Sequence, residues 1–133
     1  MIINNMISSF KNTSQQVGIY GYYYNYNLRI YHNSIRVSGS QTNNYSNSAM
    51  YFYYYNYNVK IKNNILVSES GKGSYLISVY PYFFGTGAQI DYNAYYYVGT
   101  NSGMFYNNNQ SFNDLATWKN STTGLVLPHD DHS

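Results

Sequence analysis

Apolar residues alternate with polar residues in short stretches that recur along most of the chain. In one such stretch Leu28 and Ile30 flank Arg29, and the same pattern returns at Val59 and Ala88, which lie 31 and 29 positions further on in turn. Alternation with a period of two predicts a strand with one buried face. A repeat of about 30 residues with such alternation inside it is typical of a stacked solenoid.

Each repeat unit is expected to hold three short strands. A tyrosine-rich segment opens the unit, and it occurs at residues 17–28, 48–59 and 77–88. A strand–asparagine–strand stretch follows it, at residues 30–35, 61–65 and 90–93. Residues 2–7 match the second stretch, so the repeat is expected to start at residue 1. Because one unit cannot bury its apolar side alone, equivalent strands are expected to stack in parallel around a common core.

The strand–asparagine–strand units around Asn33, Asn63, Asn64 and Asn93 resemble those of the right-handed parallel β-helix superfamily, which has the pectate-lyase-like fold. The resemblance covers residues 1–98. It implies an all-β fold, a right-handed parallel β-helix solenoid of about three to four coils with a short C-terminal helix. The superfamily includes lyases, hydrolases, epimerases, adhesins and non-catalytic surface proteins, so the fold does not select an activity.

Residues 99–133 depart from the repeat. Asn113 or Asp114 is expected to cap a short helix that carries Trp118. This helix and the Asp-x-x-Ser-like return after it resemble the endings of secreted bacterial β-helix proteins, often of the Bacteroidetes type, in which another strand usually follows. We therefore expect β-helix coils over residues 1–98, and a loop, helix and tail over 99–133 that are truncated, with further coils of the same chain as neighbours.

Composition narrows the partners and the location. Only 9% of the residues are charged and the net charge is +2, which gives no electrostatic case for nucleic acid. No apolar run approaches the roughly 20 residues of a membrane span, so membrane insertion is not expected. The chain has no cysteine, which suits the cytosol and a disulfide-free secreted protein equally. The start lacks the pattern of a signal peptide, and the resemblance implies an extracellular or cell-surface location for a longer precursor.

Tyrosines at equivalent positions of the repeat are the candidate binding residues. Aligning the three segments gives two columns, Tyr20, Tyr51 and Tyr80 in one and Tyr22, Tyr53 and Tyr82 in the other. If Ile19, Met50 and Val79 point inward, alternation points both columns outward. Flat rings with hydroxyl edges suit contact with sugars. The competing interpretation, which the sequence favours, is an aromatic ladder that only supports strand pairing.

Two other sets of repeated positions are expected to be structural. The corner asparagines, at positions 33, 63 or 64, and 93, predict a hydrogen-bonded ladder, since Asn tolerates left-handed backbone and bonds to main chain. Two further aromatic columns change to Phe in the third unit, Tyr23/Tyr54/Phe83 and Tyr24/Tyr55/Phe84. Their loss of the hydroxyl indicates packing or a corner, and not recognition.

Residues suited to catalysis are scarce. Polysaccharide lyases of this fold use Arg or Lys beside calcium-binding carboxylates, as the resemblance implies, yet only Asp91 lies on the repeating basic face of Arg29 and Lys60. The run His129 to His132 has unspecific spacing for a metal and is expected to be an exposed tail. We expect no catalytic residue, metal or cofactor in this chain.

Three functions remain open. The first is a non-catalytic segment of a secreted or cell-surface β-helix that contacts polysaccharide through its tyrosines. The second is part of a polysaccharide lyase or glycoside hydrolase with its active site in other coils. The third is a structural stalk or adhesin segment.

Overall fold

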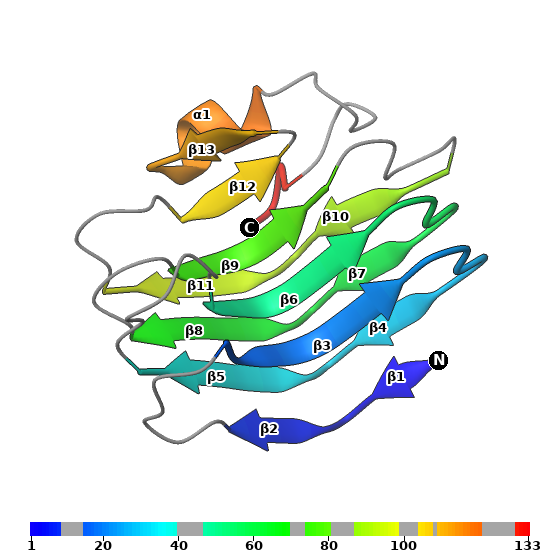
Figure 1. The fold of residues 1–133 in the computed structure, drawn as a ribbon, viewed down its shortest axis with the longest axis horizontal. Helices are drawn as coiled ribbons and strands as arrows, with labels where there is room; N and C mark the ends of the chain where they lie inside the picture. Colours follow the sequence, from blue (N-terminus) through cyan, green and yellow to red (C-terminus); the bar gives the residue numbers. More distant parts are fainter. Residues whose placement is uncertain are drawn as a thin grey trace.

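The computed structural model describes residues 1–8, 15–39, 47–69, 74–80, 87–98, 104–107, 109–120 and 130–133. Within these ranges, short strands form three sheets and one short helix follows them (Figure 1). Among the same residues, no helix has the length and hydrophobicity that a membrane span requires.

Each sheet collects one strand from every coil. The first sheet contains β1 (Ile2–Ile3), β4 (Arg29–Tyr31), β7 (Lys60–Lys62) and β10 (Gln89–Asp91). The second contains β2 (Met6–Ser8), β5 (Ser34–Ser38), β8 (Ile65–Glu69) and β11 (Ala94–Tyr97). The third contains β3 (Val17–Tyr22), β6 (Asn47–Tyr53), β9 (Ser74–Val79), β12 (Phe105–Asn107) and β13 (Gln110–Phe112).

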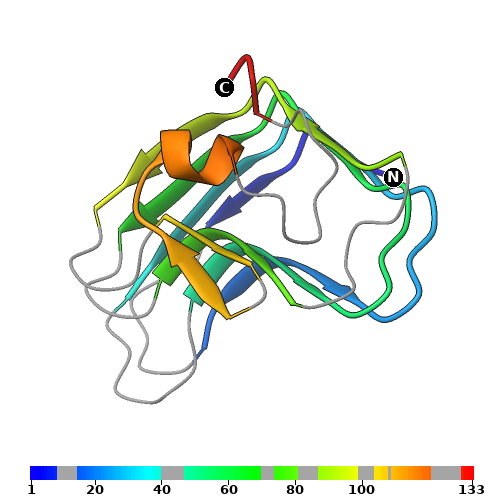
Figure 2. The same ribbon diagram turned by 90° about the horizontal axis from the view of Figure 1, so that it is seen from above.

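The chain visits the three sheets in turn, and strands three apart in sequence pair in parallel. Only the last pair, β12 with β13, is antiparallel among the described strands. Seen along the stack, the sheets surround a common interior (Figure 2). The predicted parallel β-solenoid with a short C-terminal helix is confirmed, and the described strands amount to about four coils.

Aligned apolar side chains fill this interior. Each sheet contributes one ladder: Ile2, Ile30, Ile61 and Ile90 in the first, Ile7, Ile35, Leu66 and Tyr95 in the second, and Ile19, Met50, Ile77 and Phe105 in the third. The members in the middle coils are buried, whereas Ile2 and Ile7 are only partly buried. Parallel in-register pairing thus turns the sequence repeat into a continuous core.

A ladder of asparagines, Asn5, Asn33, Asn64 and Asn93, lies at the corner between the first and second sheets; we call it the asparagine ladder. Each side-chain amide donates to the Oδ1 of the next member at 3.0 Å. The backbone N–H of the same residue donates to the same oxygen. The residue before each member has a φ of 57°, and Asn fills this left-handed position at Asn4 and Asn63. The predicted ladder is therefore confirmed, with Asn64 and not Asn63 as the member in the third coil.

The helix α1 (Leu115–Lys119) covers the C-terminal end of the core. Asp114 is its N-cap and accepts from the Thr117 backbone N–H at 2.7 Å, as predicted. Trp118 is fully buried and stacks on Phe105 with the ring centroids 4.7 Å apart. A single helical turn therefore closes one end of the solenoid with its one buried side chain.

The third sheet departs from the register that the sequence predicts. Met50 pairs with Ile77 and Phe52 with Val79, so Tyr51 lies opposite Ser78 and not opposite Tyr80. The prediction that Tyr80 continues the Tyr20 and Tyr51 column is wrong. Gln89 follows Val79 by ten positions, whereas Lys60 follows Phe52 by eight. The two additional residues lie in the connection between β9 and β10, and the slip of two keeps every side chain on its predicted face.

Candidate functional site

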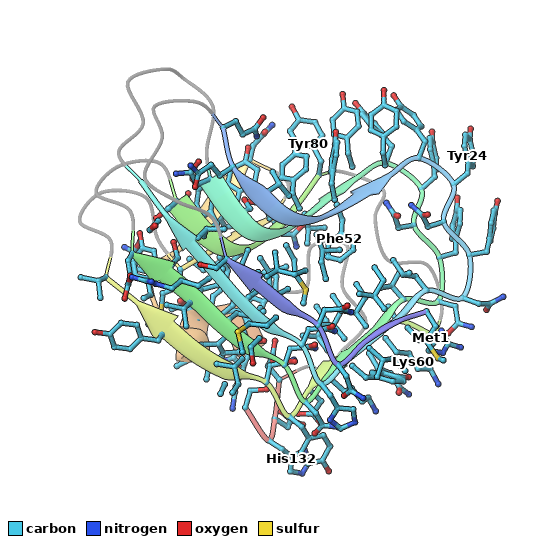
Figure 3. The ribbon with its side chains drawn as sticks, turned by 90° about the horizontal axis from the view of Figure 1, so that it is seen from below. Met1, Tyr24, Phe52, Lys60, Tyr80 and His132 are labelled. Carbon is cyan, nitrogen blue, oxygen red and sulfur yellow. The ribbon has the colours of Figure 1, made fainter. Side chains whose placement is uncertain are left out.

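Exposed and half-buried tyrosines gather along the outside of the third sheet and around the corner that leads to the first sheet. We call this set the tyrosine surface, and its members are Tyr20, Tyr22, Tyr23, Tyr24 and Tyr26 in the first tyrosine-rich segment, Tyr51, Tyr53, Tyr54, Tyr55 and Tyr57 in the second, and Tyr80 in β9's continuation. Figure 3 shows Tyr24 and Tyr80 pointing away from the ribbon on one side of the molecule, while Phe52 points into it.

Alternation along β3 and β6 aims part of this surface outward. Tyr20 pairs with Tyr51, and Tyr22 with Tyr53, in the parallel register. Between them Gly21 faces the interior, where an added Cβ would lie 2.5 Å from Cδ1 of Phe52. The glycine thus leaves room for the buried ring of the next coil, and the two rings beside it are directed to solvent.

The corner after these strands presents further tyrosines because its backbone is left-handed. Tyr23 and Tyr24 have φ of 31° and 55°, and Tyr54 and Tyr55 have 42° and 52°. A left-handed backbone is unusual for aromatic residues. A buried amide supports it, since Asn56 is fully buried and donates to the carbonyl oxygens of residues 53 and 54.

Rings of neighbouring coils stack face to face along the solenoid axis. Tyr24 and Tyr55 are 5.1 Å apart with an interplanar angle of 6°, and Tyr22 and Tyr53 are 5.7 Å apart at 5°. Two other pairs share this geometry: Tyr23 with Tyr54, and Tyr26 with Tyr57. Such stacking covers the ring faces between coils. The surface therefore presents ring edges and hydroxyl groups. Open ring faces remain on Tyr24 and Tyr26, on the side away from their stacking partners, and these side chains are 60% and 62% exposed.

The predicted tyrosines divide into three groups. Tyr20, Tyr22, Tyr51 and Tyr53 lie in the surface as expected. Tyr80 also joins it, but it contacts Tyr53 with the ring centroids 5.2 Å apart, as the register slip requires. Tyr82 lies outside the described residues.

Sequence reasoning missed much of the corner. The columns that start at Tyr23 and Tyr24 are predicted to be packing or a corner. They do form a corner, but Tyr23 and Tyr24 are exposed and Tyr54 and Tyr55 are half-buried, while Phe83 and Phe84 lie outside the described residues. Tyr26 and Tyr57 belong to none of the aligned candidate columns, yet they pair across coils. The repeated Tyr-Asn-Tyr-Asn ending of both segments was the available signal, since a repeat that preserves Tyr beside turn-forming Asn indicates an ordered corner.

Four phenols of this surface have a pKa above the ordinary value of tyrosine. Partial burial, followed by the neighbouring hydroxyls of Tyr20 and Tyr53, raises the pKa of Tyr51 to about 12. Burial and adjacent tyrosines also raise the pKa of Tyr20, Tyr23 and Tyr54. Each of these groups is neutral at physiological pH and can both donate and accept a hydrogen bond.

Three carboxylates make contacts outside this surface. Glu69 pairs with Arg36, Asp114 caps the helix, and Asp91 accepts from His132. Among the described residues, no group of three His, Asp or Glu side chains could hold a metal ion. Arg29 lies beside the corner, where its guanidinium donates to the Asn58 carbonyl at 2.7 Å. The chemistry of the surface is thus that of neutral phenols.

The prediction of an exposed tail at residues 129–132 is wrong for Asp130. Asp130 is fully buried and accepts from the indole N–H of Trp118 at 2.7 Å and from the hydroxyl of Tyr95 at 2.6 Å. His132 is exposed, but it stacks on Tyr92 and bonds to Asp91. Burial tends to raise the pKa of Asp91, yet hydrogen bonds from His132 outweigh it and lower that pKa below its usual value. His129 lies outside the described residues.

Comparisons with known proteins do not extend this description. No protein-family model, curated protein or solved structure matches the chain. What is shown is a parallel β-solenoid with an exposed tyrosine cluster.

Proposed function

We propose that this chain is a non-catalytic segment of a secreted or cell-surface right-handed β-helix protein, and that it contacts carbohydrate through the tyrosine surface. The observation that carries the proposal is the ordered stack of exposed phenols, which a fixed backbone repeats from coil to coil. The rings are already held in place by their neighbours, so binding would immobilise few side chains.

The geometry suits a polyhydroxylated ligand in two ways. The hydroxyl edges of stacked pairs such as Tyr22 and Tyr53, whose ring centroids are 5.7 Å apart, offer donors and acceptors to sugar hydroxyls in a regular row. The open faces of Tyr24 and Tyr26 offer flat apolar area for the C–H face of a sugar ring. A stack in which neighbouring rings covered every ring face could bind a sugar through its hydroxyl groups only.

The distribution of carboxylates supports a non-catalytic assignment for this segment. Glycoside hydrolysis needs two carboxyl groups across one bond, whereas Asp91, Asp114 and Asp130 each make separate structural contacts. None of these three contacts a tyrosine of the tyrosine surface.

The test is binding to a glycan array by the unmodified chain and by Tyr22→Ala and Tyr24→Ala. Tyr96→Ala is the matched control, because Tyr96 lies on β11, away from the tyrosine surface, and its exposed fraction of 57% equals that of Tyr22. We expect the first two variants to lose binding by about tenfold, from lost stacking and hydrogen bonds, and the control to bind normally.

Retained binding in both surface variants would overturn the tyrosine surface as the contact site. Absence of any glycan binding by the unmodified chain would overturn the carbohydrate proposal and leave the structural interpretation of the ladder.

A further inference from the structure

The stacked tyrosine pairs of the corner have a second chemical property, which does not depend on sugar binding. Phenols lose one electron and one proton to form tyrosyl radicals, and two such radicals couple through the carbons ortho to oxygen. We propose that Tyr24 with Tyr55, and Tyr26 with Tyr57, form a site for oxidative cross-linking that joins neighbouring coils by intramolecular dityrosine.

Parallel in-register stacking supplies the required geometry. Tyr24 and Tyr55 lie 5.1 Å apart and within 6° of parallel, and Tyr26 and Tyr57 lie 5.2 Å apart at 17°. Equivalent residues of successive coils superpose along the axis, so equivalent ring carbons of a pair face each other. Two reacting groups held in this way couple far faster than groups that must meet by diffusion.

These pairs combine close stacking with high exposure, a combination that the stacked pair of Tyr22 and Tyr53 approaches, since Tyr22 is 57% exposed and the rings are 5.7 Å apart. Tyr24 and Tyr26 are the most exposed tyrosines among the described residues, at 60% and 62%. The stacked pair at the core end, Phe105 with Trp118, is buried and contains no phenol. An oxidant in solution therefore has access to the corner, and the chain has no cysteine to intercept it.

The reaction balances with a peroxidase and hydrogen peroxide as the one-electron oxidising system. Each phenol gives up one electron and one proton, and the two radicals form one carbon–carbon bond. The hydrogen on each coupled carbon then moves to the ring oxygen and restores both phenols. Hydrogen peroxide takes up the two electrons and two protons and leaves as two molecules of water.

The experiment oxidises the intact chain at low protein concentration with a plant peroxidase and limiting hydrogen peroxide. Dityrosine fluorescence and the loss of two hydrogens from the monomer mass measure the product, and peptide sequencing by mass spectrometry locates it. The test variant carries Tyr24→Phe, Tyr26→Phe, Tyr55→Phe and Tyr57→Phe, which retain the stacked rings. The matched control carries Tyr92→Phe and Tyr96→Phe, which change exposed tyrosines outside the tyrosine surface, one before β11 and one on it.

We expect cross-linked monomer from the unmodified chain and from the control, with peptides containing residues 24 and 55 or 26 and 57 joined. The corner variant should lose these two products, and any intramolecular cross-link that it still forms should join residues 22 and 53 or 23 and 54, the other stacked pairs. Intramolecular cross-links of the unmodified chain that map only to tyrosines other than 24, 26, 55 and 57 would overturn the proposal. So would dityrosine found only in covalent dimers, in amounts that rise with protein concentration. Circular dichroism verifies that every variant retains the fold of the unmodified chain.

Discussion

The asparagine ladder and the tyrosine surface use the same device, one residue type repeated at one corner of successive coils, and they differ in which way the repeated side chain points. Asn33, Asn64 and Asn93 turn inward. Their side chains form hydrogen bonds to the neighbouring members of the ladder and to main-chain carbonyl oxygens. Tyr24 and Tyr26 turn outward and leave their hydroxyls to solvent. A residue type repeated in a column therefore indicates regular stacking of the coils. Whether its side chains are buried decides whether they stabilise the fold or are available to a ligand.

Replacing a central asparagine should have the largest effect. Asn64→Ala removes the oxygen that accepts from the backbone N–H and the side-chain amide of Asn33. It also removes the three hydrogen bonds that the Asn64 amide donates, and the site is buried. We expect a loss of about 2 to 4 kcal/mol in the free energy of unfolding, measured in urea.

Asn63→Gly is the control for that loss. Asn63 is exposed and has a φ of 57°, which glycine adopts without strain, so unfolding should change little. Equal losses for the two variants would remove the distinction between the ladder and its neighbour.

The end of the asparagine ladder should respond more weakly. The Ser133 hydroxyl accepts from the Asn93 backbone N–H at 2.9 Å and donates to Asp130 at 2.8 Å, so it takes the place of a further asparagine. Ser133→Ala should cost about 1 kcal/mol in the same measurement. Asp131→Ala, at an exposed neighbour, is the control. A cost for Ser133→Ala no greater than that of the control would show that the ladder ends at Asn93.

Alkaline pH should separate the buried part of the tyrosine surface from its exposed part. The pKa of Tyr51 in the folded chain is about 12, above the ordinary value of 10.0, so the folded state binds this proton more tightly. Its stabilising contribution is complete below pH 10 and is lost as pH rises toward 12. Tyr51→Phe should reduce the fall in urea midpoint over this range, whereas Tyr96→Phe should not. Identical pH profiles for both variants would contradict the assignment.

Removing an exposed hydroxyl should have the smallest effect. Tyr24→Phe retains the stacked ring and deletes a group directed to solvent, so the free energy of unfolding should change by less than about 0.5 kcal/mol. Calorimetric unfolding with the unmodified chain as reference measures this. A loss comparable to that of Asn64→Ala would mean that the tyrosine surface is a structural ladder of the same kind.

The fold could be predicted from the sequence because its information is local and repeated. Alternation at Ile30, Ile61 and Ile90 predicts the strands, and the spacing predicts their parallel stacking. The register slip in the third sheet could not be predicted, since Tyr51 and Tyr80 sit in similar local sequence. The slip arises from the two additional residues in the connection between β9 and β10.

Other features depended on contacts that the repeat does not encode. A buried aspartate is rare, and hydrogen bonds from the Trp118 indole, the Tyr95 hydroxyl and the Ser133 hydroxyl make Asp130 tolerable in the interior. The exposure of Tyr24 likewise follows from a left-handed backbone that Tyr seldom adopts. Neither the burial of Asp130 nor the left-handed backbone at Tyr24 can be recognised from the composition or from the alternation of apolar and polar residues.

The asparagine ladder also has a direction. The amide of each of Asn5, Asn33 and Asn64 donates one bond to the next member, toward the C-terminal coil, and those of Asn33 and Asn64 also donate to a carbonyl oxygen of the preceding coil. The bonds between members all run in one direction, so the amide dipoles along the row add, much as those of peptide groups do in a helix. The donor end of the row continues through the Asn93 backbone N–H and the Ser133 hydroxyl to Asp130, so the row is polar along the solenoid axis and ends on a carboxyl group that accepts from it.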